Sequence, residues 1–256
     1  MAPTTMARRP SGGHVRSSSV PNNRHPLLTH VDDQLRALRS WTSNPGQNPL
    51  ALAHVRALLC VLDELMLLMP LYTSTHLLDG FLALADAYSS FIGGLLALRQ
   101  HAAELRSAVR RRDPAKIASA AREQRRAAKE LVGLAAAVAR CAPMPTRASH
   151  ADVARTVAEA VGDTAAASAS VFLQVAALTD SAVAAALAIP SSSSKKRVGT
   201  VASKATAGED MQRDAALAKL LELEQCVGEL ESESEKVFRS LLQTSVSLLN
   251  IHTPII

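Results

Sequence analysis

The most regular feature of the chain is a repeat of apolar positions near its C-terminal end. Between Met211 and Ile251, apolar side chains recur at alternating steps of three and four residues, and no proline interrupts them. This spacing places one continuous stripe on a helix that lies in a coiled-coil-like groove. A helix of about forty residues is about 60 Å long, so other helices must pack along it. The stripe consists of Leu220, Leu223, Val227, Leu230, Val237, Leu241, Leu248 and Ile251, with Ser234 and Thr244 as its polar members.

Similar helical patterns fill the middle of the chain and are separated by turn residues. Asp113 and Pro114 form a favoured pair of N-cap and first helical residue. Near the N-terminus, Pro26 should block an earlier helix, and Thr29 can cap the one that follows. We predict helices from about His30, from Pro49 to Pro70, from Thr75 to the arginines before Asp113, from Pro114 to Arg140, from about His150 to Ile189, and from Met211 to Ile251.

Composition supports an all-α fold. Hydrophobic residues make up 48 % of the chain, which is enough for a sizeable core. They are mostly Ala and Leu, the best helix formers, whereas strands favour β-branched and aromatic residues. We therefore predict an elongated antiparallel bundle of about five to six helices with coiled-coil character, which forms one domain over residues 26–256.

Two low-complexity segments flank or interrupt this domain. We expect a disordered basic tail over residues 1–25 and a flexible linker at about residues 190–209, both rich in Ser. In the tail, Arg16 and Pro21 flank Ser19 as in a basophilic phosphorylation site and a 14-3-3 docking motif. The tail also has the basic, acid-free composition of an organelle transit peptide, although the apolar periodicity of a mitochondrial presequence is missing.

Charge is distributed unevenly along the chain. From Arg99 to Glu130 there are ten basic and four acidic residues, and from Glu209 to Lys236 there are nine acidic and three basic ones. A basic face can bind nucleic acid, but acids interleave with these arginines, and no DNA-binding motif is present. We therefore do not expect nucleic acid as a partner. The basic face formed by Arg122, Arg125, Arg126 and Lys129 is either exposed to solvent or paired with the acidic stretch.

No motif in the sequence indicates a catalytic nucleophile, a phosphate-binding loop or a metal site. The patterns GxSxG, GxxxxGK[ST] and HExxH are all absent. His25, His30, Asp32 and Asp33 lie close together, but capping and solvation explain the acids without a metal. We therefore predict a non-enzymatic protein with no cofactor and no metal site.

The cysteines point to an intracellular protein. They are odd in number and far apart, and no secretory signal precedes them, so we expect reduced and mostly packed thiols. The three are Cys60, Cys141 and Cys226.

The alanine-rich helix allows two interpretations. Its part from Ala165 to Ile189 is almost continuous in apolar and small residues, as in a membrane span. However, Ala barely favours lipid, and Asp180 alone would cost about 3 kcal/mol at a bilayer centre. A helix packed closely inside a bundle is favoured, and a peripheral membrane module that uses this helix and the basic tail is the alternative.

Several segments occur in an order that resembles a known family. The chain is similar to the plant-specific BYPASS-type proteins, which share a domain of unknown function. The resemblance implies a helical plant protein without known catalysis, with relatives linked to root and shoot development and found in various compartments. The segments that carry it are RSSSVP, HPLLTHVDDQLRALRSW, HLLDGFLALADAY, RRRDP, the acidic ELE repeat and VFRSLLQTSVSLLNI.

We accordingly expect an interaction or scaffold protein in the cytoplasm, with an organelle or the membrane periphery as the alternative compartment. Its partners would be proteins, including 14-3-3 if Ser19 is phosphorylated. The C-terminal helix would pack either on its own bundle or on another copy of the chain, and the sequence leaves both open. Its packing or partner face consists of Leu230, Val237, Leu241, Leu248 and Ile251.

Overall fold

The structure, a computed structural model, describes residues 25–44, 52–68, 75–141, 152–189 and 202–252. All regular secondary structure in these ranges is helical, which confirms the predicted all-α fold. The helices are α1 (Pro26–Ser43), α2 (Ala53–Leu68), α3 (Thr75–Arg111), α4 (Pro114–Ala139), α5 (Asp152–Leu187) and α6 (Ala202–His252).

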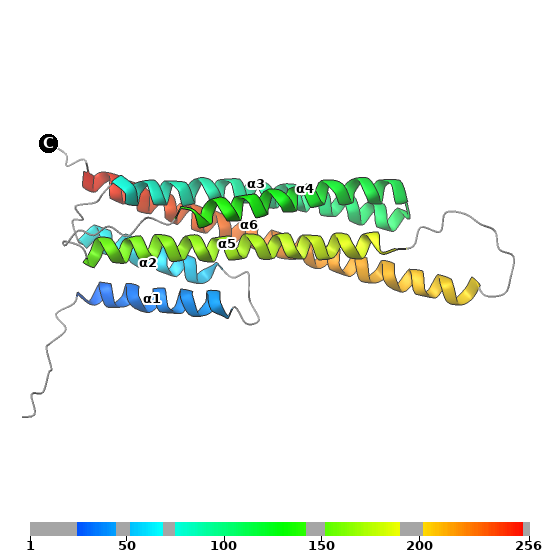
Figure 1. Ribbon diagram of the computed structural model, residues 1–256, viewed down its shortest axis with the longest axis horizontal. Helices are drawn as coiled ribbons and strands as arrows, with labels where there is room; N and C mark the ends of the chain where they lie inside the picture. The colour runs from blue at the N-terminus through cyan, green and yellow to red at the C-terminus, as the bar shows by residue number, and fades with distance from the viewer. Residues whose placement is uncertain (1–24, 45–51, 69–74, 142–151, 190–201, 253–256) are drawn as a thin grey trace, which may run out of the picture.

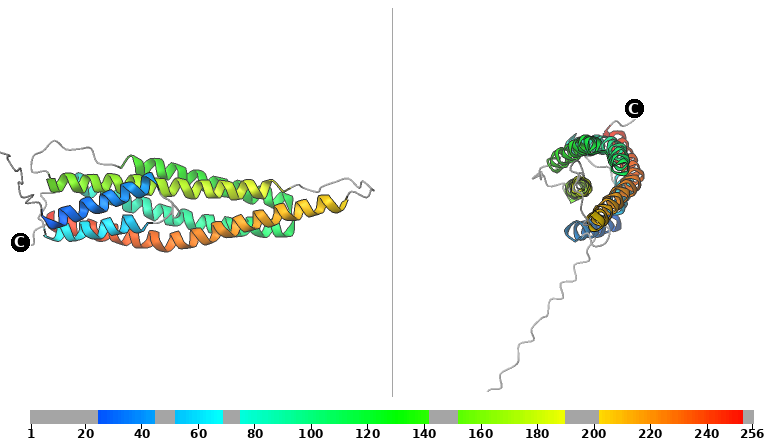
Figure 2. Two further views of the ribbon diagram at one scale, coloured as in Figure 1. Left: turned by 90° about the horizontal axis from the view of Figure 1, so that it is seen from below. Right: turned by 90° about the vertical axis from the view of Figure 1, so that its right-hand side faces the viewer.

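The helices form an elongated antiparallel bundle, as predicted (Figure 1). α3 and α4 make a hairpin at one end, and α6 runs beside α3 along most of the bundle (Figures 1 and 2). The register of α3 and α6 is antiparallel, because Arg99 pairs with Glu231 and Arg106 pairs with Glu224. The shorter helices α1 and α2 cover only one half of the bundle's length (Figure 1).

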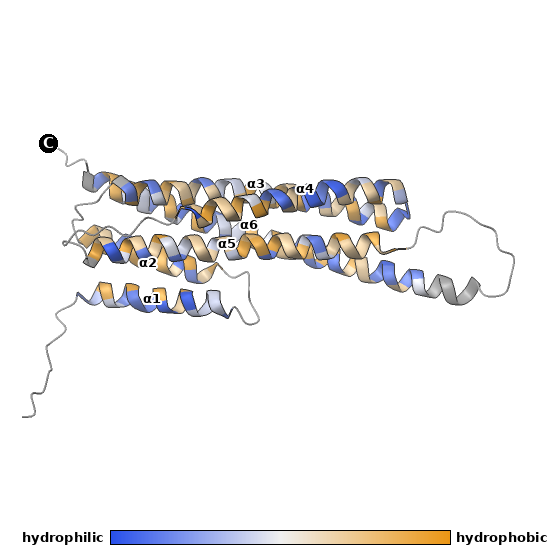
Figure 3. Cartoon of the chain, viewed as in Figure 1, coloured by the Kyte–Doolittle hydropathy of each residue, from blue (hydrophilic) through white to orange (hydrophobic). Residues whose placement is uncertain are grey.

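One continuous hydrophobic core lies between the helices. Apolar and polar residues alternate along each helix, as expected when amphipathic helices surround a shared interior (Figure 3). An aromatic cluster joins α3 to α5, where the Phe91 and Phe172 rings stack with centroids 3.9 Å apart. Beside it, the buried Tyr88 hydroxyl lies 2.9 Å from Oγ of Ser168, and burial raises the pKa of Tyr88. This hydrogen bond allows a polar group to lie within the core.

The start of the first helix differs from the prediction. α1 begins at Pro26 rather than at about His30, and Nδ1 of His25 accepts a hydrogen bond from the Leu27 amide at 3.3 Å. Proline has no amide hydrogen to leave unpaired in the first turn, so it suits the first position of this helix. The predicted start at about His30, with Thr29 as the N-cap, was therefore wrong.

Two other helix starts bear on the predicted boundaries. At α4, Asp113 is the N-cap, and its carboxylate accepts from the Lys116 amide at 3.1 Å, which confirms the predicted cap. At the C-terminal helix, α6 already begins at Ala202. Residues 202–209 are therefore helical, although they had been assigned to the linker, and the rest of that segment lies outside the described residues.

The paired glycines in α3 mark a close helix contact. A Cβ atom at Gly94 would lie 3.0 Å from Cδ2 of Leu131 in α4, whereas one at Gly93 would meet nothing within 4 Å. Gly94 therefore allows α3 and α4 to approach each other closely. The helix is continuous through this pair, so the glycines do not end it.

The C-terminal helix packs on its own bundle. Its most extensive contacts are with α3, and it also contacts α2 and α5. Ser234 and Thr244 interrupt the apolar stripe and are themselves fully buried. Ile251 is part of α6, but its side chain lies outside the described part of the chain. The other members of the predicted face are at most 3 % exposed: Leu230, Val237, Leu241 and Leu248.

Two neighbouring leucines in α6 provide a matched test of this packing. Leu241 is fully buried and Leu242 is 40 % exposed. We expect Leu241→Asp to lower the free energy of unfolding by about 4 kcal/mol or more, because it buries an unpaired carboxylate. Leu242→Asp should cost about 1 kcal/mol or less. Thermal unfolding followed by circular dichroism measures both, and equal melting temperatures for the two variants would contradict the burial of this face.

Candidate interaction surface

The acidic half of α6 is largely paired within the bundle. Glu231 lies 2.7 Å from Arg99, and Glu224 lies 3.0 Å from Arg106, both on α3. Glu233 lies 3.3 Å from Arg56 on α2. These contacts fix the register of α6 against its neighbours, although partly exposed ion pairs of this kind each add little stability.

Local pairing also affects the titration of the same acidic stretch. A hydrogen bond from Lys236, 2.7 Å from Glu233, lowers the pKa of that carboxyl, and the charges of Lys236 and Arg56 lower it further. A lowered carboxyl pKa stabilises the fold at pH values above the ordinary glutamate range, and this contribution is lost as the pH falls through the folded pKa. In acid, Glu233 therefore loses mainly its pairing with Lys236 within α6, and with it the weaker attraction to Arg56 on α2.

The basic residues of α4 face solvent. The sequence left open whether they pair with the acidic stretch, and the structure shows that α3 and α2 provide its partners instead. One of the four basic side chains forms a local ion pair, in which Arg126 lies 3.5 Å from Glu130. The exposed set consists of Arg122, Arg125, Arg126 and Lys129.

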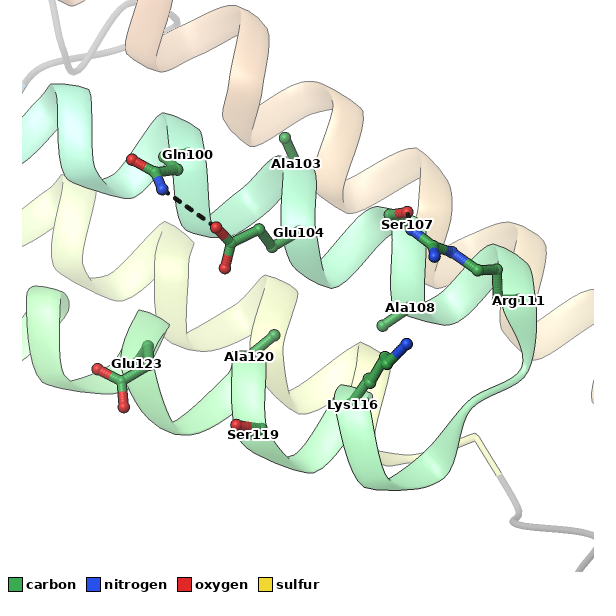
Figure 4. Close-up of a pocket in the computed structure, with 10 residues that line it drawn as sticks. All are labelled: Gln100, Ala103, Glu104, Ser107, Ala108, Arg111, Lys116, Ser119, Ala120 and Glu123. Atoms are coloured by element: carbon green, nitrogen blue, oxygen red, sulfur yellow. Dashed lines mark hydrogen bonds between the residues drawn. The ribbon is translucent and has the colours of Figure 1, made fainter.

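A groove runs between α3 and α4 near their connecting turn (Figure 4). It is open to solvent and has a volume of about 540 Å³. Small side chains form its floor, among them Ala108 and Ala120, so that the two helices leave space between their outer rims. The lining residues are Gln100, Ala103, Glu104, Ser107, Ala108, Arg111, Lys116, Ser119, Ala120 and Glu123.

The two ends of the groove carry opposite charges. Arg111 and Lys116 lie at the end next to the α3–α4 turn, and Glu104 and Glu123 lie at the other end (Figure 4). Ser107 accepts a hydrogen bond from Arg111, and the two side chains lie together in Figure 4. Such a surface can bind a ligand that carries a carboxylate and a cation a short distance apart.

The charged groups of the groove are only partly neutralised by their neighbours. Glu104 accepts a hydrogen bond from Gln100 at 3.1 Å, and Lys116 lies 3.6 Å from Asp113. Glu123 has no ion-pair partner within the ranges that the structure describes. Exposed and incompletely paired charges lose little if they change partner, which suits a binding surface.

A buried amide in α4 was not anticipated. Gln124 is fully buried, and neither of its side-chain polar atoms has a hydrogen-bond partner among the described residues. Leaving such a group unpaired costs about 1 to 3 kcal/mol. Ala121 and Ala128, three positions before it and four after it, are buried, so helical spacing places Gln124 on the buried face of α4.

The predicted phosphorylation and docking motif lies outside the described residues. Arg16, Ser19 and Pro21 all belong to it, and the structure brings none of them to a site. At the described start of the chain, His25 caps α1, and His30 lies 3.4 Å from Gln34. Within the described ranges, no group of three His, Cys, Asp or Glu side chains is placed to hold a metal ion.

Two helices are long and apolar enough to cross a membrane. They are α3, over His76–Arg111, and α5, over Val153–Leu187, and in each case 44 % of the most apolar window is buried inside the bundle. In α5, Phe172 and Val175 are fully buried against the other helices. The core helices of a bundle meet the same criterion, so it is weak evidence for a membrane span.

Comparison with known protein families gives a match. A family model described as "Protein BPS1" matches residues 71–251, more than two thirds of the 256-residue chain. The matched span includes α3, α4, α5 and all of α6 except His252, and therefore the groove. No curated protein and no solved structure matches the chain.

The cysteines differ in exposure and should differ in reactivity. Cys60 is exposed, because it lies on the outer side of α2, whereas Cys141 and Cys226 are half-buried. The expectation of mostly packed thiols therefore does not extend to Cys60. Burial, together with the charges of Glu229 and Glu222, raises the pKa of Cys226 to about 11. Only about one Cys226 side chain in a thousand is therefore a thiolate at pH 8, and the thiolate is the reactive form.

We expect iodoacetamide at pH 8 to alkylate Cys60 at least about tenfold faster than Cys226. The rate at Cys226 should rise as the pH approaches 11, because more of its thiol ionises. Peptide mass spectrometry measures both rates, and unfolding in guanidinium should make them similar. Equal rates in the folded protein would contradict the burial of Cys226.

Proposed function

Because the chain belongs to the BPS1 family, a plant family of unknown molecular function, we propose that it acts as a non-enzymatic interaction or scaffold protein. The family match confirms the BYPASS-type resemblance found in the sequence. The observation that carries the proposal is the groove between α3 and α4, an open surface with carboxylates at one end and cations at the other.

Several properties of the groove fit a protein segment as its occupant. Its floor of small residues lets another helix approach closely, and its rims offer charges for pairing. It lies on two long helices that share one core with the rest of the bundle, so its shape is fixed before binding.

The biological setting is proposed from the cysteines and from the family resemblance. The cysteine pattern favours a cytoplasmic location, and the BYPASS-type relatives imply a link to root and shoot development. A 14-3-3 protein is a proposed partner when Ser19 is phosphorylated, because Arg16 and Pro21 complete the recognition pattern. If protein purified from plant tissue carries no phosphate on Ser19, a 14-3-3 protein is excluded as a partner at this site.

A peripheral membrane module is the alternative function. It rests on the basic tail and on the length and hydropathy of α5. Against it, membrane insertion would require α5 to exchange its buried contacts with α1, α3, α4 and α6 for lipid. Fractionation of tagged protein distinguishes the membrane module from the proposed interaction protein. A salt-resistant membrane pellet favours the membrane module, and recovery of all the protein in the soluble fraction excludes it.

A bulky side chain in the groove tests the proposed function. Ser119 is an exposed residue of the groove, and we expect Ser119→Tyr to prevent partner capture by blocking the groove, with a change in unfolding free energy of about 0.5 kcal/mol or less. The matched control is Ala136→Tyr, at an exposed position of the same helix that does not line the groove. The readout is proximity labelling in meristem tissue.

The groove is the binding surface if partners are lost with Ser119→Tyr and kept with Ala136→Tyr. An unchanged set of labelled proteins with Ser119→Tyr would show that partners bind elsewhere.

A further inference from the structure

We propose that a second copy of the chain occupies the groove, paired antiparallel about a two-fold axis that passes near Ser107 and Ser119. This inference rests on the proposed function, because it names the partner of the same surface. Along α3, Ser107 lies between Glu104 and Arg111, and along α4, Ser119 lies between Lys116 and Glu123. A two-fold axis at this point brings the same surface of both copies together, as in most homodimers.

The spacing of the charges makes the surface complementary to itself. Glu104 and Arg111 are seven residues apart on α3, and on α4 Lys116 and Glu123 are also seven apart. Seven residues correspond to two helical turns, about 10 Å along the axis. Rotation by 180° exchanges the two ends, so the carboxylates of each copy face the cations of the other. Each of the four charged groups of one copy then lies opposite a group of the other sign in the second copy.

Other occupants fit this charge pattern less well. The basic tail of the chain carries Arg8, Arg9, Arg16 and Arg24 and no acid, so the cationic end of the groove would repel it. An anionic lipid surface or a nucleic acid would be repelled by Glu104 and Glu123. The acidic half of α6 already pairs with α2 and α3 of its own bundle. The α3–α4 hairpin of a second copy carries both positive and negative groups at the required separation.

The position of the groove also limits the strength of the contact. It lies next to the α3–α4 turn, so only the last few turns of each hairpin can overlap (Figure 4). Stable interfaces bury roughly 1,200 Å² or more, and so few helical turns favour a smaller contact. The dimer is therefore weak, depends on protein concentration and weakens with salt, because exposed ion pairs are screened.

Charge reversal at one end of the groove tests the pairing. The acid-end variant is Glu104→Lys with Glu123→Lys, and the cation-end variant is Arg111→Glu with Lys116→Glu. Sedimentation velocity at low salt, over protein concentrations up to about the millimolar range of weak complexes, measures association. Circular dichroism melting confirms that each variant is folded.

The wild-type chain should form a dimer that dissociates as salt is added. Each double variant alone should remain monomeric, because like charges then meet across the axis. An equimolar mixture of the two should dimerise again, since the reversed ends are complementary, and a chain with all four reversals should also self-associate.

Two results would overturn the inference. One is a wild-type chain that stays monomeric at the highest concentration. The other is a dimer that persists in either double variant alone, or that the mixture of variants fails to restore. The wild type could be monomeric by sedimentation velocity while Ser119→Tyr still loses its partners in proximity labelling. In that case a second copy is excluded as the occupant of the groove, and the proposed function stands.

Discussion

The seam between α3 and α6 is the contact on which the rest of the structure depends. The apolar stripe of α6 is buried against the bundle, and ion pairs at Arg99 and Arg106 set its register. Because α6 runs along most of the bundle, this seam connects the end that holds α1 and α2 with the α3–α4 hairpin (Figure 1). Burial of the stripe supplies the driving force, and the exposed ion pairs contribute mainly alignment.

This seam also determines which surfaces remain for partners. The acidic residues of α6 that pair with α2 and α3 are less available to an external protein. The outer side of the α3–α4 hairpin stays free of the other helices and carries the groove and the basic residues of α4. The bundle pairs one acidic face internally and presents a groove of mixed charge, and this arrangement supports the proposed interaction role.

The sequence predicted the features that local pattern determines. Alternating steps of three and four residues identified the buried stripe of α6, and Asp113 identified the start of α4. Whether α6 packs on its own bundle could not be predicted, because both choices bury the same residues. The groove was also missed: it depends on the register of α3 against α4, which places small residues such as Ala108 and Ala120 together. The partners of the acidic stretch were left open for the same reason.

Hydrogen exchange along α6, measured by mass spectrometry at a protein concentration low enough for a monomer, tests the central claim most directly. If α6 packs on its own bundle, the amides from Leu220 to Leu248 exchange as slowly as those in the middle of α3, because both helices open only with the shared core. Exchange of these α6 amides at the rate of an unfolded chain, while α3 stays protected, would contradict this packing.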